Sequence, residues 1–431
     1  MPGYLTANDR PGIHADSWYA ATAGPLSDHP RLCGDIQAEV CVIGGGYAGL
    51  STALHLAELG TDVVLLEANR IGWGASGRNG GQLGIGQRKG PEEYEPKVGK
   101  AKAREIWHLG NRANQLVRDL IRAHQIECEL VENGYLEAAI KPSHAREYRD
   151  YPDIMATEYG HESLRFVARE EMAEMLGTDV YHGGLFDSLG AHLHPLKYAL
   201  GLGRAATARG VRIFEQSRVT SVTPGRVETE QGVVQANHIV LAMNGYIDGL
   251  VPRAAQRTIS INNFVAATEP LGEERARSLI RDNPSVCDSK FVLNYYRLTP
   301  DHRLLWGGGE SYGRRFPSDI PALVRRTMLE IFPQLSDVGF SHAWGGTLAI
   351  TAPRIPVFRE WDRIWSISGW SGSGIHMATM GGKITADAIN GDRTAWEMMS
   401  SLPVPPFPGG SWFRAPLVAA AMTWYGIRDR L

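Results

Sequence analysis

The chain has 431 residues, which is long enough for two or more domains. Its composition, 43% hydrophobic and 21% charged, is ordinary for a globular protein in water. The formal net charge of −3 and the lack of any long Lys or Arg run argue against nucleic acid or an acidic membrane surface as the main partner.

The cysteines and the N-terminus indicate an intracellular setting. The four cysteines are scattered without a C-x-x-C pair, which disfavours a zinc site or a disulfide framework: Cys33, Cys41, Cys128 and Cys287. The N-terminus lacks the apolar stretch of a signal peptide, and no run of about 18 apolar residues predicts a membrane span. We therefore expect a cytoplasmic protein.

The clearest motif lies near the N-terminus. Residues 39–43 are predicted to form a buried strand, a glycine-rich turn follows at 44–49, and 50–57 carry apolar residues at helical spacing. Residues 61–66 form a second apolar segment that ends at Glu67. This order of strand, glycine turn, helix, strand and acidic residue is typical of a dinucleotide-binding unit, although a tight turn without a ligand is the alternative.

Each part of this unit has a mechanical role. Gly44 permits the tight turn, Gly46 lets the backbone approach a pyrophosphate, and Gly49 lets the helix pack on the strand. The free N–H groups of the helix N-terminus face the phosphates, and the acidic residue roughly 20 positions further on binds a ribose hydroxyl. The expected cofactor contacts are Gly44, Gly46, Tyr47, Ala48, Gly49, Glu67 and Ala68.

A second glycine-rich segment at 70–82 indicates which dinucleotide binds. Its small residues allow the backbone to lie close to a large flat ligand, and its polar residues supply hydrogen-bond donors. NAD does not need such a segment, whereas an extended FAD is suited by it; a flexible surface loop is the alternative. The expected contacts are Gly74, Ala75, Ser76, Arg78, Asn79, Gly80, Gly81 and Gln82.

The middle of the chain alternates between helices and short strands. Residues 237–242 are predicted to form a strand that runs into a turn of small residues, as a sheet needs where a cofactor crosses its carboxyl edge. Ala242 and Val219 are therefore expected to contact the cofactor. Helices are predicted at 100–124, 195–209, 272–282 and 319–332, and other strands at 211–214, 217–223, 225–230, 232–235, 259–268, 291–299 and 303–309.

A second glycine turn lies near the end of the chain. Residues 363–368 are predicted to form a strand, 369–374 a turn, and the helix after it begins at Ile375. Such a helix N-terminus stabilises negative charge on the N1/C2 oxygen edge of a reduced flavin, although a generic strand-to-helix connection has the same pattern. The expected contacts are Gly372, Ser373, Gly374 and Ile375.

These motifs together resemble the D-amino-acid oxidase/sarcosine oxidase (DAO) family of FAD-dependent oxidoreductases. The chain is most similar to the γ-glutamylputrescine oxidase branch, and the resemblance covers nearly all of it. The matching segments are 18–21 (WYAA), 44–49, 71–82 (IGWGASGRNGGQ), 190–195 (GAHLHP), 295–299 (YYRLT), 303–309 (RLLWGGG), 332–335 (FPQL), 369–374 and 406–410 (PFPGG).

The resemblance implies an α/β (α+β) fold with two interleaved parts. One is a Rossmann-like FAD-binding domain carrying the GxGxxG turn, and the other is a substrate domain on a mixed, antiparallel-rich sheet. The expected boundaries are 36–85, 190–250 and 340–395 for the FAD-binding domain, 86–189 and 251–339 for the substrate domain, and 396–431 for a C-terminal tail.

The implied chemistry is oxidation of a small-molecule amine. A hydride leaves the carbon beside the nitrogen for flavin N5, the imine hydrolyses, and O2 takes the electrons to give H2O2. The implied substrate is γ-glutamylputrescine or another polyamine-derived amine. The alternatives are an oxidase or dehydrogenase of a cyclic or N-alkyl amino acid such as pipecolate or sarcosine, and an FAD-binding protein without catalysis.

Two departures from sarcosine oxidases refine this expectation. Those enzymes attach flavin through a Cys in the last third of the chain, and here no Cys follows Cys287, so FAD is expected to be non-covalent. They also use a Lys near the flavin to activate oxygen, and residues 303–309 contain none. An electron acceptor other than O2 therefore stays open.

The resemblance also implies substrate-site residues. On the strand that faces the flavin, alternation puts Tyr295 and Arg297 on one face and Tyr296 on the other, so not all three can point inward. Tyr296 is expected near the substrate, and Arg297 as its packing or charge support. Trp370 would contribute to an aromatic wall, as would Trp306 and Trp344 unless they are ordinary core. His376 occupies the position at which sarcosine oxidases hold the substrate carboxylate with Lys, so that clamp is altered. A histidine at the start of a helix that bonds to a neighbour is the alternative.

Two tempting motifs are given little weight. His192 and His194 have the spacing of paired metal ligands, but no third ligand is visible, and no metal site is predicted. The apolar segment 415–431 has the residues to touch a membrane surface, but docking on its own domain or on a partner subunit is the favoured interpretation.

Overall fold

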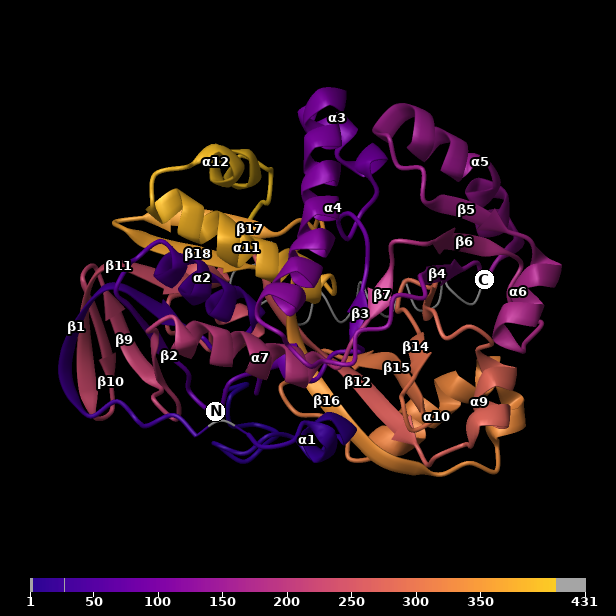
Figure 1. Ribbon diagram of the computed structural model, residues 1–431, viewed down its shortest axis with the longest axis horizontal. Helices are drawn as coiled ribbons and strands as arrows, with labels where there is room; N and C mark the ends of the chain where they lie inside the picture. Colours follow the sequence, from indigo (N-terminus) through magenta and orange to yellow (C-terminus); the bar gives the residue numbers. More distant parts are fainter. Residues whose placement is uncertain (1–2, 27, 408–431) are drawn as a thin grey trace.

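The computed structural model describes residues 3–26 and 28–407, and these build two sheets that face a common space (Figure 1). The first sheet is mostly parallel: β1 pairs in parallel with β2 and β11, and only its edges are antiparallel. Its main path runs through β17 (Val357–Trp361), β18 (Ile364–Ser368), β11 (Gly232–Leu241), β1 (Gly34–Ile43), β2 (Val63–Leu66) and β8 (Arg212–Phe214); β10 (Arg226–Thr229) and β9 (Val219–Thr223) extend from β11.

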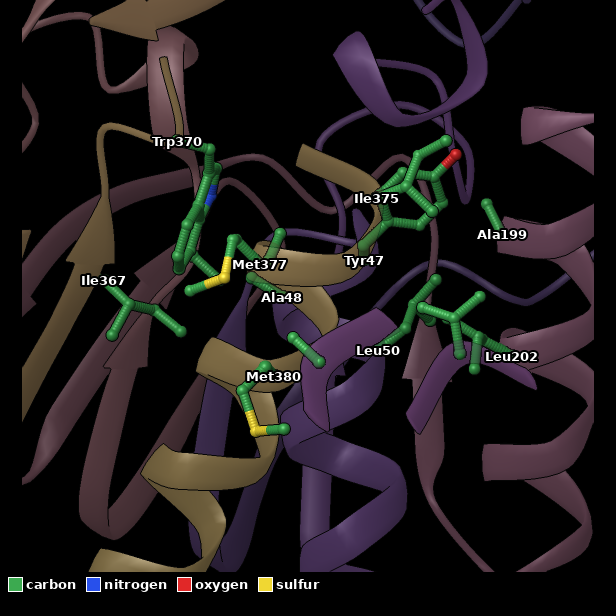
Figure 2. Close-up of a cluster of buried hydrophobic side chains, with 14 of the residues drawn as sticks. Tyr47, Ala48, Leu50, Ala199, Leu202, Ile367, Trp370, Ile375, Met377 and Met380 are labelled. Atoms are coloured by element: carbon green, nitrogen blue, oxygen red, sulfur yellow. The ribbon is translucent and has the colours of Figure 1, made fainter. Parts of the chain in front are cut away.

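The central strands of this sheet are buried, which is typical of parallel strands. The last four residues of β1 and all four of β2 are buried, as expected for strands that are covered on both faces. One covering layer contains α2 (Tyr47–Glu58), α7 (Pro195–Ala208) and α11 (Gly374–Ile389). Figure 2 shows Leu50 of α2 beside Leu202 of α7, and Met377 and Met380 of α11 on its other side.

Helices α2 and α11 approach each other closely at Gly382. A Cβ atom on Gly382 would lie 2.5 Å from the carbonyl oxygen of Ala48, well inside van der Waals contact. The long helix α4 (Lys100–Ala123) also packs on α11, and its residues Ile106, Leu109 and Val117 are buried in the same core. The N-terminal ends of α2 and α11 are thereby held side by side at one edge of the sheet.

The second sheet is mostly antiparallel, with one parallel pair between β13 and β4. Its spatial order is β16 (Phe340–Ile350), β12 (Ile259–Thr268), β15 (Leu304–Ser311), β14 (Tyr295–Leu298), β13 (Ser285–Asp288), β4 (Tyr135–Ala138), β6 (Gly184–Asp187) and β5 (Leu164–Val167). Its own core lies on the face covered by α10 (Ile320–Ile331), α9 (Glu273–Leu279) and α6 (Arg169–Leu176), while α5 (Pro142–Tyr159) packs on β5.

Short elements connect the two parts. A two-stranded antiparallel sheet joins β3 (Gln82–Leu83) to β7 (Ala191–His192). The remaining elements are α1 (Trp18–Thr22), η1 (Ala75–Gly77), η2 (Pro91–Glu93), α3 (Glu95–Val98), η3 (Asn244–Tyr246), α8 (Pro252–Ala255), η4 (Pro333–Leu335) and α12 (Thr394–Ser400). Within the described ranges, no helix has both the length and the apolar character that a membrane crossing requires.

The structure confirms the two-part α/β fold and changes several boundaries. β16 pairs along its length with β12, so the chain returns to the first sheet after Ile350 and not at residue 340. α4 packs on the cofactor-side helices although its segment was assigned to the substrate domain. The strands predicted at 232–235 and 237–242 are one strand, β11. Strands β4, β5, β6 and β13 were not predicted, and the predicted segment 415–431 lies outside the described residues.

Candidate active site

A cavity of about 740 Å³ lies between the carboxyl ends of β1, β2 and β11 and the inner face of the second sheet. Most of the predicted cofactor contacts line it: Gly44, Gly46, Tyr47, Ala48, Glu67, Ala68, Gly74, Ala75, Ser76, Arg78, Asn79, Gly80, Gln82, Val219, Ala242, Gly372, Ser373, Gly374 and Ile375. Its position is the one where nucleotide ligands bind in open α/β sheets, outside the carboxyl ends of the strands.

In the first glycine turn, residues 44–49, side chains at two of the glycines would clash with backbone atoms. Gly44 has φ +113°, and a Cβ atom there would lie 2.8 Å from the carbonyl oxygen of Ala242. Gly49 does not line the cavity; a Cβ atom at this position would lie 1.9 Å from the carbonyl oxygen of Gly44. Gly49 therefore serves helix packing, and Gly44 lets the turn bring the N-terminus of α2 up to the cavity.

Glu67 lies where β2 ends. Its Oε2 accepts a hydrogen bond from Gly45 N (2.7 Å) and its Oε1 accepts one from Asn69 N (2.7 Å). Burial raises the pKa of this carboxyl to about 7. Each oxygen keeps a second lone pair for a hydroxyl donor from the cavity, as ribose recognition requires.

The second glycine-rich segment is held by its own polar side chains. Ser76 Oγ accepts from Tyr47 N (3.1 Å), and Asn79 Nδ2 donates to the carbonyl oxygens of Ala75 (3.0 Å) and Ser76 (3.1 Å). Arg78 is paired with Asp9 (2.7 Å) and also donates to the carbonyl oxygen of Trp73 (2.7 Å). Asn79 and Arg78 thus shape this part of the cavity wall in addition to lining it.

The last glycine turn closes another wall. Gly372, Ser373, Gly374 and Ile375 line the cavity at the start of α11, a helix of 16 residues. The first N–H groups of such a helix have no carbonyl partner within the helix and favour negative charge beside them. Two helix N-termini, those of α2 and α11, therefore face the same cavity.

The residues of this cavity fit FAD. One part offers a glycine turn, a helix N-terminus and Glu67 for a ribose and pyrophosphate, and another offers the small residues at 74–80 and the start of α11 for a flat ring system. Gly81, also predicted as a contact, is not part of the cavity lining. A Cβ atom on Gly81 would lie 2.1 Å from the carbonyl oxygen of Leu193, so this glycine packs against the segment before α7.

The second sheet presents Tyr295 to the cavity, and not Tyr296 as predicted. Tyr295 OH donates to Asn263 Oδ1 within the cavity wall. Tyr296 lies on the opposite face of the sheet, stacked on Trp306 with ring centroids 4.6 Å apart, and its hydroxyl donates to Tyr181 (3.1 Å). The prediction for Tyr296 was wrong because β14 pairs with β15 in the register that turns the even-numbered residue toward the helices.

Arg297 lies on the same face as Tyr295 but does not line the cavity. Its side chain is 2% exposed, and it donates from Nε to the carbonyl oxygen of Gly80 (2.8 Å) and from Nη2 to that of Leu193 (3.0 Å). Arg297 therefore holds the loop at 79–82 from outside the cavity lining.

His376 also lies outside the lining, which corrects its predicted place at the substrate. Nε2 donates to the carbonyl oxygen of Gly86 (3.1 Å), and burial lowers the pKa of the imidazole to about 4. It stays neutral near pH 7 and fixes the segment that follows β3. The turn before α11 directs residue 376 toward that segment, so His376 does not occupy the place of a carboxylate clamp.

Of the predicted aromatic wall, only Trp370 lines the cavity. Trp306 belongs to the core of the second sheet, and Trp344 donates to the carbonyl oxygen of Arg78 (2.9 Å). His192 donates to the carbonyl oxygen of Asn283 (3.1 Å), and His194 caps α7. Among residues 3–26 and 28–407 no three His, Cys, Asp or Glu side chains gather as a metal site would need.

Sequence reasoning missed several cavity residues at the side of the second sheet: Arg88, Tyr135, Cys287, Phe291, Glu310 and Arg354. Burial raises the pKa of the Glu310 carboxyl, and its Oε2 accepts from Tyr312 OH (3.0 Å). The Arg354 guanidinium lies 5.7 Å from the ring centroid of Phe291. The one local signal was Glu310, a carboxylate directly after the apolar and glycine-rich strand segment 304–309.

Comparisons with known proteins bear on this cavity directly. Residues 39–388 match the family described as DAO, FAD dependent oxidoreductase. The chain belongs to this family. FAD is therefore its cofactor, and the chain is an FAD-dependent oxidoreductase.

Two bacterial relatives of this DAO-family chain match almost end to end. The Probable oxidoreductase OrdL of Rhizobium meliloti is 39% identical over 96% of this chain and 97% of the relative. The Gamma-glutamylputrescine oxidoreductase of Escherichia coli is 38% identical over 97% of this chain and 99% of the relative. Glycine oxidase from Geobacillus kaustophilus shares the fold, with a TM-score of 0.70 at 18% identity over 83% of this chain and 96% of that chain.

Replacement of Glu67 tests the assignment of the ribose site. Glu67→Ala should weaken FAD binding about 10- to 100-fold, because hydrogen bonds to a charged group are worth about 1.5–3 kcal/mol. Glu67→Gln keeps one acceptor oxygen and should have an intermediate effect. The measurement is the dissociation constant from fluorescence titration of FAD into apoprotein.

Glu39→Ala serves as the matched control, because Glu39 is an exposed carboxylate on β1 outside the cavity. Its FAD affinity should equal that of the wild type. Retention of FAD by Glu67→Ala through extensive dialysis, at the wild-type level, would show that Glu67 does not bind the cofactor.

Proposed function

We propose that this DAO-family enzyme oxidises γ-glutamylputrescine or a closely related polyamine-derived amine at its free amino end. The observation that carries the proposal is the end-to-end similarity to the E. coli Gamma-glutamylputrescine oxidoreductase. The cavity supports it, because the lining continues from the cofactor motifs to aromatic and charged residues of the second sheet.

The proposed reaction is a two-electron oxidation of the amine to an imine. When bound, FAD supplies the acceptor that takes a hydride from the carbon beside the nitrogen. The nitrogen lone pair then forms the C=N bond, and water adds to the imine to release an aldehyde and ammonia. The amine must enter this step without its extra proton, because an ammonium nitrogen has no lone pair to share.

The protein's own part is to orient the amine and to exclude water. Tyr295 and Trp370 bring two aromatic rings to the cavity from opposite parts of the fold, and Tyr295 is held by its bond to Asn263. Fixed rings on both sides restrict how a flexible aliphatic amine lies, which contributes to the rate through orientation. The apolar wall also favours the neutral form of the amine over the charged one.

The cavity contains one cysteine among the described residues, Cys287. Burial raises the pKa of its thiol, and the thiol shares a hydrogen bond with Tyr135 OH (2.7 Å). A buried, protonated thiol is a poor nucleophile. This supports our proposal that FAD is bound without a covalent tether.

We further propose O2 as the electron acceptor, so that each turnover forms one H2O2. Solved structures of the same fold are named both oxidase and dehydrogenase, so this choice extends beyond the shared fold and is tested by the reaction products. A dehydrogenase that passes its electrons to another acceptor is the alternative, and a product assay separates the two.

The product assay uses the purified flavoprotein in air with γ-glutamylputrescine, putrescine, spermidine, sarcosine, pipecolate and D-alanine as separate substrates. γ-Glutamylputrescine should give the highest kcat/KM, with aldehyde, ammonia and H2O2 in equal amounts. Aldehyde without H2O2, formed only with an artificial acceptor, would contradict O2 as the acceptor. Preference for pipecolate or sarcosine would contradict the substrate class.

The two neighbouring tyrosines of β14 provide a second test. Tyr295→Phe should lower kcat/KM for the amine, by about 10-fold if its hydroxyl positions the reactive group through Asn263. Tyr296→Phe is the matched control, because it removes a hydroxyl from the far face of the same strand. It should lower the melting temperature slightly and leave kcat/KM unchanged. The reverse pattern would contradict the orientation of this strand.

A further inference from the structure

One part of the cavity wall gathers three charged side chains from distant segments. Arg88 follows β3, Glu310 lies near the end of β15, and Arg354 lies in the connection between β16 and β17. None of them is used by the hydride-transfer step described above. They adjoin residues of the second sheet, and the cradle for the pyrophosphate is at the start of α2, on the first sheet.

The guanidinium groups of Arg88 and Arg354 are available to bind a ligand in the cavity. Among the described residues, neither guanidinium is within 4.0 Å of a carboxylate or has a hydrogen-bond acceptor, in contrast to Arg78, whose charge is paired with Asp9. Arg354 rests on the ring of Phe291 (5.7 Å), and its backbone is held at φ +59° with its N–H donating to Thr351 O (3.1 Å). Arg88 Nε lies 3.9 Å from the position a Cβ would take on Gly372.

The charges in this region influence one another. Burial lowers the pKa of the Arg354 guanidinium, the neighbouring charge of Arg88 lowers it further, and Glu310 opposes both effects. For Glu310, burial raises the pKa and the two arginines lower it. Two positive charges and one carboxylate leave an excess of one positive charge in this part of the cavity wall.

A carboxylate is the anion that best complements this arrangement. Guanidinium groups bind carboxylates through paired, charge-assisted hydrogen bonds, and a partly buried charge is costly without a partner. Glu310, the acidic member, complements a cation next to that carboxylate. A carboxylate with an ammonium group beside it is the head group of an α-amino acid.

We propose that Arg88 and Arg354 bind the carboxylate, and Glu310 the ammonium, of an α-amino acid head group that the substrate carries in addition to its oxidised amine. This inference rests on the proposed function and deepens it, because it assigns specificity for γ-glutamyl amines to three residues. The reacting amine then approaches the cofactor at the other end of a chain that spans the cavity.

The test compares γ-glutamylputrescine with N-acetylputrescine, which has the same amide and free amine but no head group. Arg88→Gln, Arg354→Gln and Glu310→Gln should each lower the ratio of kcat/KM for γ-glutamylputrescine to that for N-acetylputrescine by about 10- to 100-fold. The loss should fall mainly on KM, because the head group is bound equally in the ground state and the transition state.

Arg253→Gln is the matched control. Arg253 also places its guanidinium over an aromatic ring, at 4.9 Å from the centroid of Trp361, but it is exposed and lies outside the cavity. The ratio should keep its wild-type value in this variant. Equal losses for both substrates in the three cavity variants, or no loss at all, would overturn the head-group assignment.

A binding measurement separates this inference from the proposed function. γ-Glutamylbutylamine carries the head group but lacks the terminal amine that the enzyme is proposed to oxidise, so its binding to the FAD-loaded enzyme is measured by calorimetry without turnover. Binding by the wild type, and about 10-fold or more weaker binding by Arg354→Gln, would support the head-group site even if γ-glutamylputrescine were not oxidised. Absence of binding to the wild type would overturn it.

Discussion

The cavity of this enzyme depends on the buried guanidinium of Arg297. This side chain projects from the second sheet and donates hydrogen bonds to carbonyl oxygens of Gly80 and Leu193, which belong to the cofactor side. The three peptide segments meet at a buried charge, and removal of that charge would leave two carbonyl groups without donors. Tyr295 projects from the same face of the same strand, so Arg297 ties the strand that carries Tyr295 to the cofactor side.

The cofactor half could be predicted from sequence because its determinants are local. Gly44, Gly49 and Glu67 act within one strand–turn–helix–strand unit, where close backbone approach permits no side chain at the glycines. The loop at 74–80 and the turn before α11 are also short, continuous segments whose glycines could be recognised from sequence. These segments also carry the resemblance to the DAO family, which is why fold, family and cofactor all followed from them.

The substrate half depends on orientation, which the sequence does not encode locally. Tyr295 and Tyr296 are neighbours of the same type, and only the pairing of β14 with β13 and β15 decides which one faces the cavity. His376 follows the last glycine turn, yet the path of the chain directs it to Gly86. Arg88, Glu310 and Arg354 come together from three segments that share no motif, so only the fold reveals them. The boundary at β16 was misplaced for the same reason, because strand pairing crosses the predicted border.

If an amine is oxidised in the cavity that holds FAD, as we propose, the amine must reduce the flavin directly. The most direct measurement is anaerobic titration of the purified, FAD-loaded enzyme with γ-glutamylputrescine while the visible absorption band of oxidised flavin is followed. The band should disappear with one equivalent of amine per flavin and return when air is admitted, with N-acetylputrescine much less effective. A band that persists with every amine tested, and that only a chemical reductant removes, would contradict amine oxidation in this cavity.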